Sequence, residues 1–212
     1  MRLDHVSYAA EPYALLDVVQ RLGSAIGAGF TDGGRHPRFG TRNFVLPVAG
    51  GAYVEVVAAL DHPSAERAPF GQAVRRRAGN GGGWLGWVVA VDDIAPVEHR
   101  LGRSSVPGHR VRPDGVDLQW RQIGIFDLLD DPQLPFFVEW GVPPQEHPSA
   151  GARADVRIAR LEIAGDPHVV TRWLGEPVEH PLDGVEVDWV DGDGPGLVAV
   201  HVETPHGVVR ID

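Results

Sequence analysis

Two distant stretches of the chain share one pattern, and this pattern constrains the fold more than any other feature. Residues 51–58 read GAYVEVVA and residues 134–141 read LPFFVEWG, each a short apolar run with one glutamate, Glu55 or Glu139. A carboxylate within a buried strand is costly unless a partner compensates its charge. The two stretches therefore indicate an internal repeat, in which each copy directs one acidic group at a shared site for a metal ion or a polar ligand.

The first copy, residues 1–61, reads as a β-α-β-β-β unit. Its opening residues alternate apolar and polar side chains as a strand does, and a stretch with leucines and valines on one helical face follows. The expected elements are a strand at residues 2–10, a helix at 13–27, a short second strand associated with the turn-rich residues 28–40, and strands at 41–48 and 51–58 joined by a hairpin turn.

The same order recurs after a connecting segment, residues 62–83, which reads as a helix followed by a Gly-rich link. The second copy, residues 84–147, is expected to have strands at 84–92, near 105–110, at 116–125 and at 134–141, with a helix at 93–102. Residues 155–212 repeat the pattern less completely, starting from VRIARLEIAGDP, and are interpreted as a third partial unit.

Such repetition predicts the fold class. One unit cannot bury its own sheet face, so neighbouring copies must pack together. We expect an α+β chain in which two paired β-α-β-β-β units form a cup-shaped sheet with helices outside, accompanied by a third partial unit at the C-terminal end. Side chains that point inward from the strands would then meet inside the cup.

Composition excludes several function classes. The chain has 212 residues, with 19 basic against 29 acidic side chains and a formal net charge of −10, which disfavours nucleic acid as a partner. It has no cysteine, so disulfides, thiolate metal sites and cysteine nucleophiles are excluded. No apolar run approaches the ~20 residues needed to span a bilayer. The first residues carry charges and lack the apolar core of a signal peptide, so we expect a cytoplasmic protein.

Five segments together resemble a known family, over about the first 145 residues. They are LDHVSYA at 3–9, GGRHPRFGTRN at 33–43, YVEVVA at 53–58, RPDGVDLQWR at 112–121 and PFFVEWG at 135–141. The chain resembles the vicinal-oxygen-chelate superfamily, and more closely its glyoxalase-like domain branch. In that superfamily two β-α-β-β-β modules form a cup around a divalent metal, with ligands from the first and last strands of each module.

The resemblance implies a metal set of His5, Glu55 and Glu139, which suits Fe, Mn, Ni or Zn with open coordination positions. The fourth ligand position falls on Trp87, and an indole cannot bind a metal. The alternative is that Glu55 and Glu139 hydrogen-bond to Trp, Tyr or Arg side chains inside the cup, and that His5 is a half-buried histidine with satisfied hydrogen bonds.

The Gly-rich segment supplies further candidates. His36 is a candidate general base, and Arg42 and Asn43 are candidate substrate-binding residues, with a plain turn surrounded by solvated charges as the alternative. Trp87, Trp120, Phe137 and Trp140 lie on predicted strands, and those that face inward would form an aromatic-lined pocket, with ordinary core packing as the alternative. Of these, Trp87 and Trp120 are the candidate substrate-binding residues.

Two functions follow from the resemblance. The first is a metal-dependent small-molecule enzyme of lyase, isomerase or ring-cleaving dioxygenase type. The second is a non-catalytic protein that sequesters a small molecule, as bleomycin-resistance members do; a degenerate scaffold filled by its own tryptophans is a third interpretation. The expected partner is a small-molecule ligand, with neither nucleic acid nor membrane, and exposed sheet edges leave a homodimer open.

Overall fold

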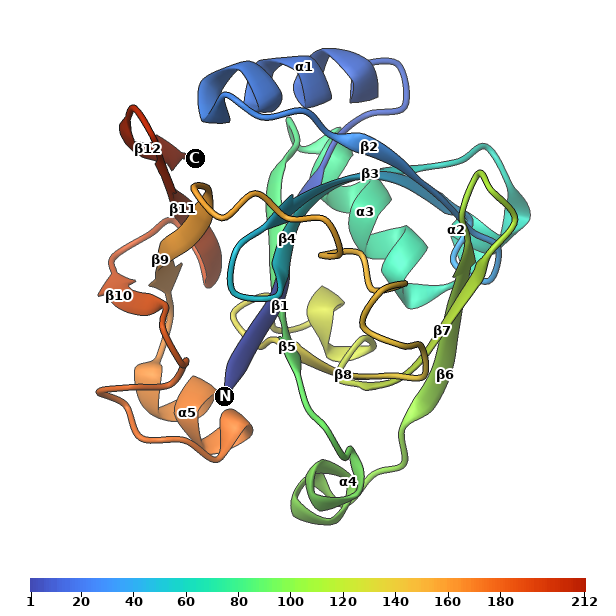
Figure 1. Ribbon diagram of the computed structural model, residues 1–212. Helices are drawn as coiled ribbons and strands as arrows, with labels where there is room; N and C mark the ends of the chain where they lie inside the picture. Colours follow the sequence, from blue (N-terminus) through green and yellow to red (C-terminus); the bar gives the residue numbers. More distant parts are fainter.

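The computed structural model describes residues 1–212 and contains two sheets (Figure 1). Eight strands form a closed barrel: β1 (Arg2–Ala9), β2 (Thr31–His36), β3 (Thr41–Val48), β4 (Ala52–Ala59), β5 (Gly83–Ala90), β6 (Val106–Val111), β7 (Asp117–Ile123) and β8 (Phe136–Trp140). The helices of this part are α1 (Leu15–Ile26), α2 (Pro63–Arg67), α3 (Pro69–Gly79) and α4 (Ala95–Leu101), with a 3-10 turn η1 (Asp127–Leu129).

The barrel consists of two halves with the same strand order. The first half runs β1-β4-β3-β2 and the second runs β5-β8-β7-β6, and in each half the first strand is parallel to the last. The halves join along β1 and β5, which are antiparallel, and meet again where Arg35 of β2 pairs with Val111 of β6. The predicted fold class is therefore confirmed, although this second junction closes the sheet further than a cup.

The connecting segment fills one part of the barrel interior. It forms two helices, α2 and α3, rather than the single helix expected from the sequence. Phe70, Ala73 and Val74 of α3 belong to the same buried cluster as Val57 of β4 and Val88 of β5. Because the interior is blocked there, polar side chains gather in the part of the barrel that the helices leave open.

The C-terminal unit lies beside the barrel and contains β9 (Arg157–Ala164), α5 (Pro167–Leu174), β10 (Glu186–Val190), β11 (Gly196–Thr204) and β12 (Gly207–Ile211) (Figure 1). It keeps the β-α-β-β-β order, but its strand order is β10-β9-β11-β12, so its first strand lies inside the sheet. Apolar side chains of this sheet share a buried core with Trp84 and Trp87 of β5. The indole Nε1 of Trp84 donates to the carbonyl of Ile211 at 2.8 Å, which ties β12 to the barrel.

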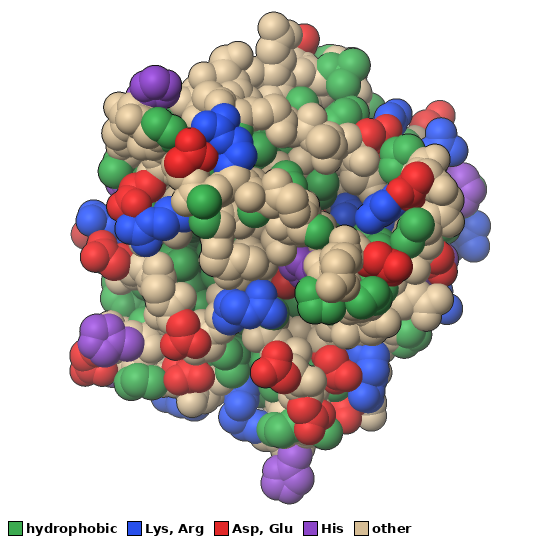
Figure 2. All heavy atoms as spheres, viewed as in Figure 1, with side chains coloured by type: hydrophobic (Ala, Val, Ile, Leu, Met, Phe, Trp, Pro, Cys, Tyr) green, Lys and Arg blue, Asp and Glu red, His purple; other side chains and the backbone are tan.

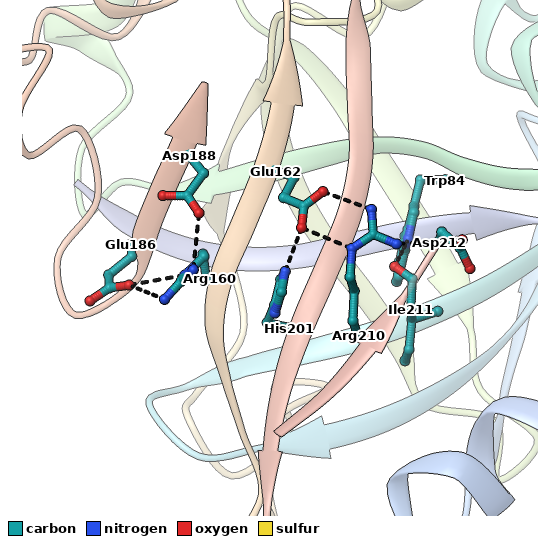
Figure 3. Close-up of polar contacts among 9 residues, drawn as sticks. All are labelled: Trp84, Arg160, Glu162, Glu186, Asp188, His201, Arg210, Ile211 and Asp212. Atoms are coloured by element: carbon teal, nitrogen blue, oxygen red, sulfur yellow. Dashed lines mark hydrogen bonds and ion pairs between the residues drawn. The ribbon is translucent and has the colours of Figure 1, made fainter. Parts of the chain in front are cut away.

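The opposite face of this sheet carries ion pairs, some exposed and some half-buried (Figure 3). Arg160 pairs with Glu186 and Asp188, each at 3.0 Å, while the Glu162 carboxylate accepts from His201 and Arg210. Exposed pairs of this kind each contribute about 1 kcal/mol or less. Figure 2 shows acidic and basic side chains mixed over the visible surface of the molecule.

The segment between β8 and β9, residues 141–156, crosses the barrel in front of β3 and β4 in Figure 1. Val48 of β3 forms an isolated parallel bridge with Arg153, and the amide of Ala49 donates to the carbonyl of Val156 at 2.8 Å. This crossing brings His147 to the barrel mouth, where it reaches a buried carboxylate on β1. No helix in the structure has the length and apolar character that crossing a bilayer requires.

Candidate functional site

A small cavity lies inside the barrel, between α3 and the mouth that residues 141–156 cross. Its free volume is about 30 Å³, room for about one water molecule. Five of its lining residues are polar: His5, His36, Glu55, Arg110 and Gln122. The aromatic lining residues are Phe39, Tyr53, Phe70, Trp120, Phe136 and Trp140. The cavity is thus an apolar pocket with a few buried polar groups, the usual composition of a small-molecule site.

Asp4 and His5 form a buried pair at an irregularity of β1. The register between β1 and β5 shifts between Leu3 and His5, a β-bulge that lets both side chains reach the interior. The Asp4 carboxylate lies 2.7 Å from His5 Nδ1, and its other oxygen accepts from Trp140 Nε1 at 3.0 Å and His147 Nε2 at 3.2 Å.

The charge state of Asp4 determines which nitrogen of His5 carries a proton. Burial raises the pKa of Asp4, but the hydrogen bonds from His147 and His5 outweigh it and hold the pKa well below its ordinary value. An ionised carboxylate only accepts hydrogen bonds, so His5 Nδ1 is the donor. In the neutral imidazole, Nε2 then carries a lone pair, and no protein group bonds to it.

Glu55 is held by donors on both of its oxygens. Ser7 Oγ donates to Oε2 at 2.5 Å and Asn43 Nδ2 donates to Oε1 at 2.6 Å. Burial raises the pKa of Glu55, but electrostatic interactions with the His5 and His36 rings and these two hydrogen bonds lower it by more, so the net shift is downward. Glu55 is therefore a carboxylate at neutral pH, although only 3% of its surface is exposed.

His36 is a neutral imidazole on the wall of the cavity. Burial is the main cause that lowers its pKa, to about 3. Its Nδ1 lies 2.9 Å from Thr41 Oγ1, and its ring meets Trp120 edge-on with 6.1 Å between centroids. At neutral pH the free nitrogen of His36 offers a hydrogen bond to a ligand but no positive charge.

Three buried polar atoms near the cavity have no hydrogen-bond partner: Asn43 Oδ1, Arg110 Nε and Gln122 Nε2. Gly33 allows two of these residues to approach the backbone closely. A Cβ atom at Gly33 would lie 2.2 Å from Asn43 Oδ1 and 2.7 Å from Arg110 Nη1. The absence of a side chain at residue 33 thus leaves room for the buried amide and guanidinium.

Four of the predicted site residues line this cavity: His5, Glu55, His36 and Trp120. Asn43 is fully buried behind them and bonds to Glu55 rather than facing the cavity. The structure thus brings together His5 and Glu55 of the predicted metal set, while Glu139, Trp87 and Arg42 lie elsewhere.

Glu139 points out of the barrel, which corrects its prediction as a metal ligand. On β8 the cavity-lining residues are Phe136, Val138 and Trp140, and successive side chains of a strand alternate between faces. Glu139 Oε2 accepts from the backbone N–H of Ile94 at 2.9 Å and so satisfies the start of α4. The VEW pattern correctly predicted that Glu139 lies on a strand, but its side chain is on the outer face of the barrel.

Trp87 and Arg42 also lie outside the cavity, which corrects their prediction as substrate-binding residues. Trp87 is fully buried in the core between the barrel and the C-terminal sheet, where its Nε1 donates to the Gln133 carbonyl at 3.0 Å. Arg42 pairs with Asp32 at 2.5 Å on the outer side of β3, with 38% of its side chain exposed.

The predicted metal set therefore does not fit one ion. Glu139 lies on the opposite face of its strand from His5 and Glu55, and both Glu55 oxygens already accept hydrogen bonds. No group of three or more His, Asp or Glu side chains in the structure is arranged to hold a metal ion. The chemistry of this cavity is accordingly derived from its own side chains.

The sequence analysis missed Asp4, Tyr53 and Arg110 as site residues. Strand alternation was the available signal for Tyr53, because it lies two residues from Glu55 on the same face. Asp4 could not be found by alternation, since the bulge on β1 breaks that period.

Comparison with known proteins adds the family. Residues 3–178 match the glyoxalase-like domain family. A crystal structure of a hypothetical protein from Staphylococcus aureus has a TM-score of 0.75 at 14% identity, covering 100% of this chain and 98% of that chain, which shows a shared fold. Methylmalonyl-CoA epimerase from Mycobacterium tuberculosis has a TM-score of 0.44 at 17% identity, covering 67% of this chain and 89% of its own. No curated protein sequence matches the chain.

Proposed function

We propose a function from one premise: the chain belongs to the glyoxalase-like domain family, a branch of the vicinal-oxygen-chelate superfamily. It is an enzyme of lyase or isomerase type that moves a proton on a small molecule held in the barrel cavity. His5 is the group that accepts and returns the proton, and Asp4 is the residue that positions it.

The observation that carries this proposal is the orientation of His5. His5 lines the cavity, and its Nδ1 donates to the fully buried Asp4 carboxylate at 2.7 Å. Its Nε2 has no hydrogen-bond partner in the protein. A base oriented by a third group, with a free nitrogen next to the substrate space, is the usual arrangement of general base catalysis.

Glu55 and Asp4 place negative charge near His5. When His5 accepts a proton, it becomes an imidazolium within the influence of both carboxylates, each of which remains ionised at neutral pH. In a buried site this attraction is stronger than in water. His36, which stays neutral, contributes a hydrogen bond to an oxygen of the substrate rather than a charge.

The size of the cavity restricts the substrate. About 30 Å³ is free, so a ligand larger than water must displace aromatic side chains or enter from the mouth that residues 141–156 cross. Phe70 of α3 and Trp140 of β8 both line the cavity. We expect a small, flat substrate whose body contacts these rings.

The test is deuterium incorporation from D₂O into small carbonyl compounds and 2-oxo acids, followed by NMR. The unaltered protein should exchange a carbon-bound proton of at least one compound, and His5→Asn should slow that exchange by a factor of about 10²–10⁴. Glu139→Gln, which alters a carboxylate outside the cavity, should exchange at the normal rate. Equal exchange by His5→Asn, or no exchange with any compound, would contradict the proposal.

A second candidate function, sequestration of a small molecule, is favoured by the aromatic lining. Eight of the 13 lining residues are hydrophobic, and Trp120 and Trp140 lie with 5.1 Å between ring centroids. A sequestering protein should bind its ligand without any proton exchange. The affinity for this ligand should be lower in Trp120→Ala and unchanged in His5→Asn. For the catalytic function, in contrast, His5→Asn is the variant that slows proton exchange.

A further inference from the structure

Arg110 is a buried cation without a counter-ion. It lies on β6 with 2% of its surface exposed, and no carboxylate lies within 4.0 Å of its guanidinium to form an ion pair. Its Nε has no hydrogen-bond partner. A guanidinium does not lose its proton in proteins, so this charge persists in the barrel. An unpaired buried charge destabilises a folded protein, so Arg110 requires a partner that the protein itself does not supply.

The two carboxylates inside the barrel are committed to other donors. Asp4 accepts from His5, Trp140 and His147, and Glu55 accepts from Ser7 and Asn43. His36 is neutral and brings no negative charge. The buried residues around the cavity therefore leave Arg110 without an anion of its own.

Arg110 also occupies the boundary between two hollows. It lines the inner cavity, and it lines a surface groove formed by the start of β2, the second half of β3 and residues 145–153. Arg112 and Arg153 line the same groove, but each is paired, with Asp114 and Asp155 respectively. Among these three arginines, only Arg110 is free to bind an incoming group.

We infer that the ligand of this cavity carries a carboxylate that pairs with Arg110 at the mouth, while its body lies against the aromatic wall. The planar guanidinium matches a carboxylate with two parallel hydrogen bonds. A phosphate is less suitable because its second negative charge would face Asp4 and Glu55 in the same small space. This inference rests on the proposed function only in placing the ligand in the same cavity.

Pairs of small acids and their neutral amides test it directly. Acetate against acetamide and benzoate against benzamide are titrated into the unaltered protein, with tryptophan fluorescence and thermal unfolding as readouts, since Trp120 and Trp140 line the cavity. At least one acid should bind at least about tenfold more tightly than its amide, the difference expected for a charge-assisted bidentate contact. Phenylphosphonate and inorganic phosphate serve as the phosphate-type probes.

Arg110→Gln should abolish the preference for the acid, with Arg112→Gln as the matched control from the same groove. Arg110→Gln should also unfold at an equal or higher temperature than the unaltered protein, because it removes an unpaired buried charge. If Arg110→Gln fails to fold, Arg110 has a structural partner and the inference is wrong. Equal binding of acid and amide, an unchanged preference in Arg110→Gln, or tighter binding of a phosphate-type probe would each overturn it.

His5→Asn separates this inference from the proposed function. The variant should keep the preference for the acid over its amide, because His5 takes no part in the contact with Arg110. Acid binding that depends on Arg110, without proton exchange by any variant, would support the carboxylate site and remove the catalytic proposal. Proton exchange that depends on His5, without any preference for acids, would support the catalytic proposal and remove the carboxylate site.

Discussion

The imidazole of His5 stacks on the ring of Tyr53, with 4.4 Å between centroids and 16° between the planes. The two residues are direct neighbours in the parallel pairing of β1 and β4. Burial raises the pKa of the Tyr53 phenol well above its ordinary value, so this ring is neutral. The stack fixes the plane of the imidazole and the bond to Asp4 fixes its rotation, so His5 is held in one orientation before a ligand arrives.

Gly108→Ala tests the packing of the cavity wall. Gly108 pairs with Trp120 across β6 and β7, and a Cβ at residue 108 would lie 2.3 Å from Trp120 Nε1. The indole must move, which we expect to destabilise the protein by about 1–3 kcal/mol and to shift tryptophan emission. Urea unfolding measures the first effect. Gly29→Ala, where a Cβ meets nothing within 4 Å, should leave both unchanged.

His36 makes stability depend on pH. Its pKa is about 3 when folded, below the ordinary value of 6.5, so the unfolded chain binds the proton more readily. The contribution of neutral His36 is complete above pH 6.5 and is lost as the pH falls towards 3, by on the order of 3–5 kcal/mol.

The measurement is the free energy of unfolding between pH 7.5 and 4, compared with His36→Gln. This variant should show a shallower decline, whereas His99→Gln, at an exposed residue of α4, should follow the unaltered protein. Parallel declines for the unaltered protein and His36→Gln would show that His36 does not titrate between the two states.

Glu55→Gln and Glu139→Gln should differ although both remove a carboxylate from a strand. Glu139→Gln keeps an oxygen that can accept from Ile94, so the free energy of unfolding should change by less than about 1 kcal/mol. Glu55→Gln replaces a buried acceptor that has two donors and should cost about 1–3 kcal/mol at pH 7.

The pH dependence of this difference gives a second readout. The folded pKa of Glu55 is lowered, so its carboxylate contributes stability above its ordinary value of 4.5 that is lost as the pH falls through the folded value. The gap between Glu55→Gln and the unaltered protein should therefore narrow below pH 4.5. A gap independent of pH would mean that the charge of Glu55 is not responsible.

Trp87→Phe should affect stability alone. The smaller ring leaves a cavity in the core, and the Gln133 carbonyl loses its hydrogen-bond donor. We expect the free energy of unfolding to fall by about 2–4 kcal/mol. Binding of the carboxylate probes should be unaffected after correction for unfolded protein. Weaker binding in Trp87→Phe than in Trp120→Phe would show that the wrong tryptophan has been assigned to the cavity wall.

The sequence predicted the elements well because their periodicity is local. The expected strand at 41–48 matches β3 in full, and most other predicted strands and helices differ from the observed ones by one to three residues at their ends. The strand β2 lies in the Gly-rich segment 28–40, where composition indicates turns more strongly than pairing. Its register depends on the neighbouring strands β3 and β6.

The site was predicted in part, and the failures have two physical causes. A one-residue change of register moves a side chain to the other face, so Glu139 was assigned to the interior in place of Val138. The role of Arg110 depends on what is absent around it, a buried counter-ion, which no local pattern reveals. The inward position of Asp4 depends on the β-bulge in β1, which the sequence pattern does not predict.

The two halves of the barrel contribute different residues to the cavity, which affects how the protein can evolve. On β1 and β4 the inward residues are His5, Ser7 and Glu55, whereas the matching strands β5 and β8 present Val88, Phe136 and Val138. The first half carries the histidines and carboxylates of the cavity, and the second half supplies Arg110 and the rings of Trp120, Phe136 and Trp140. Mutations in the second half can therefore change which ligand fits the cavity while His5, His36 and Glu55 stay in place.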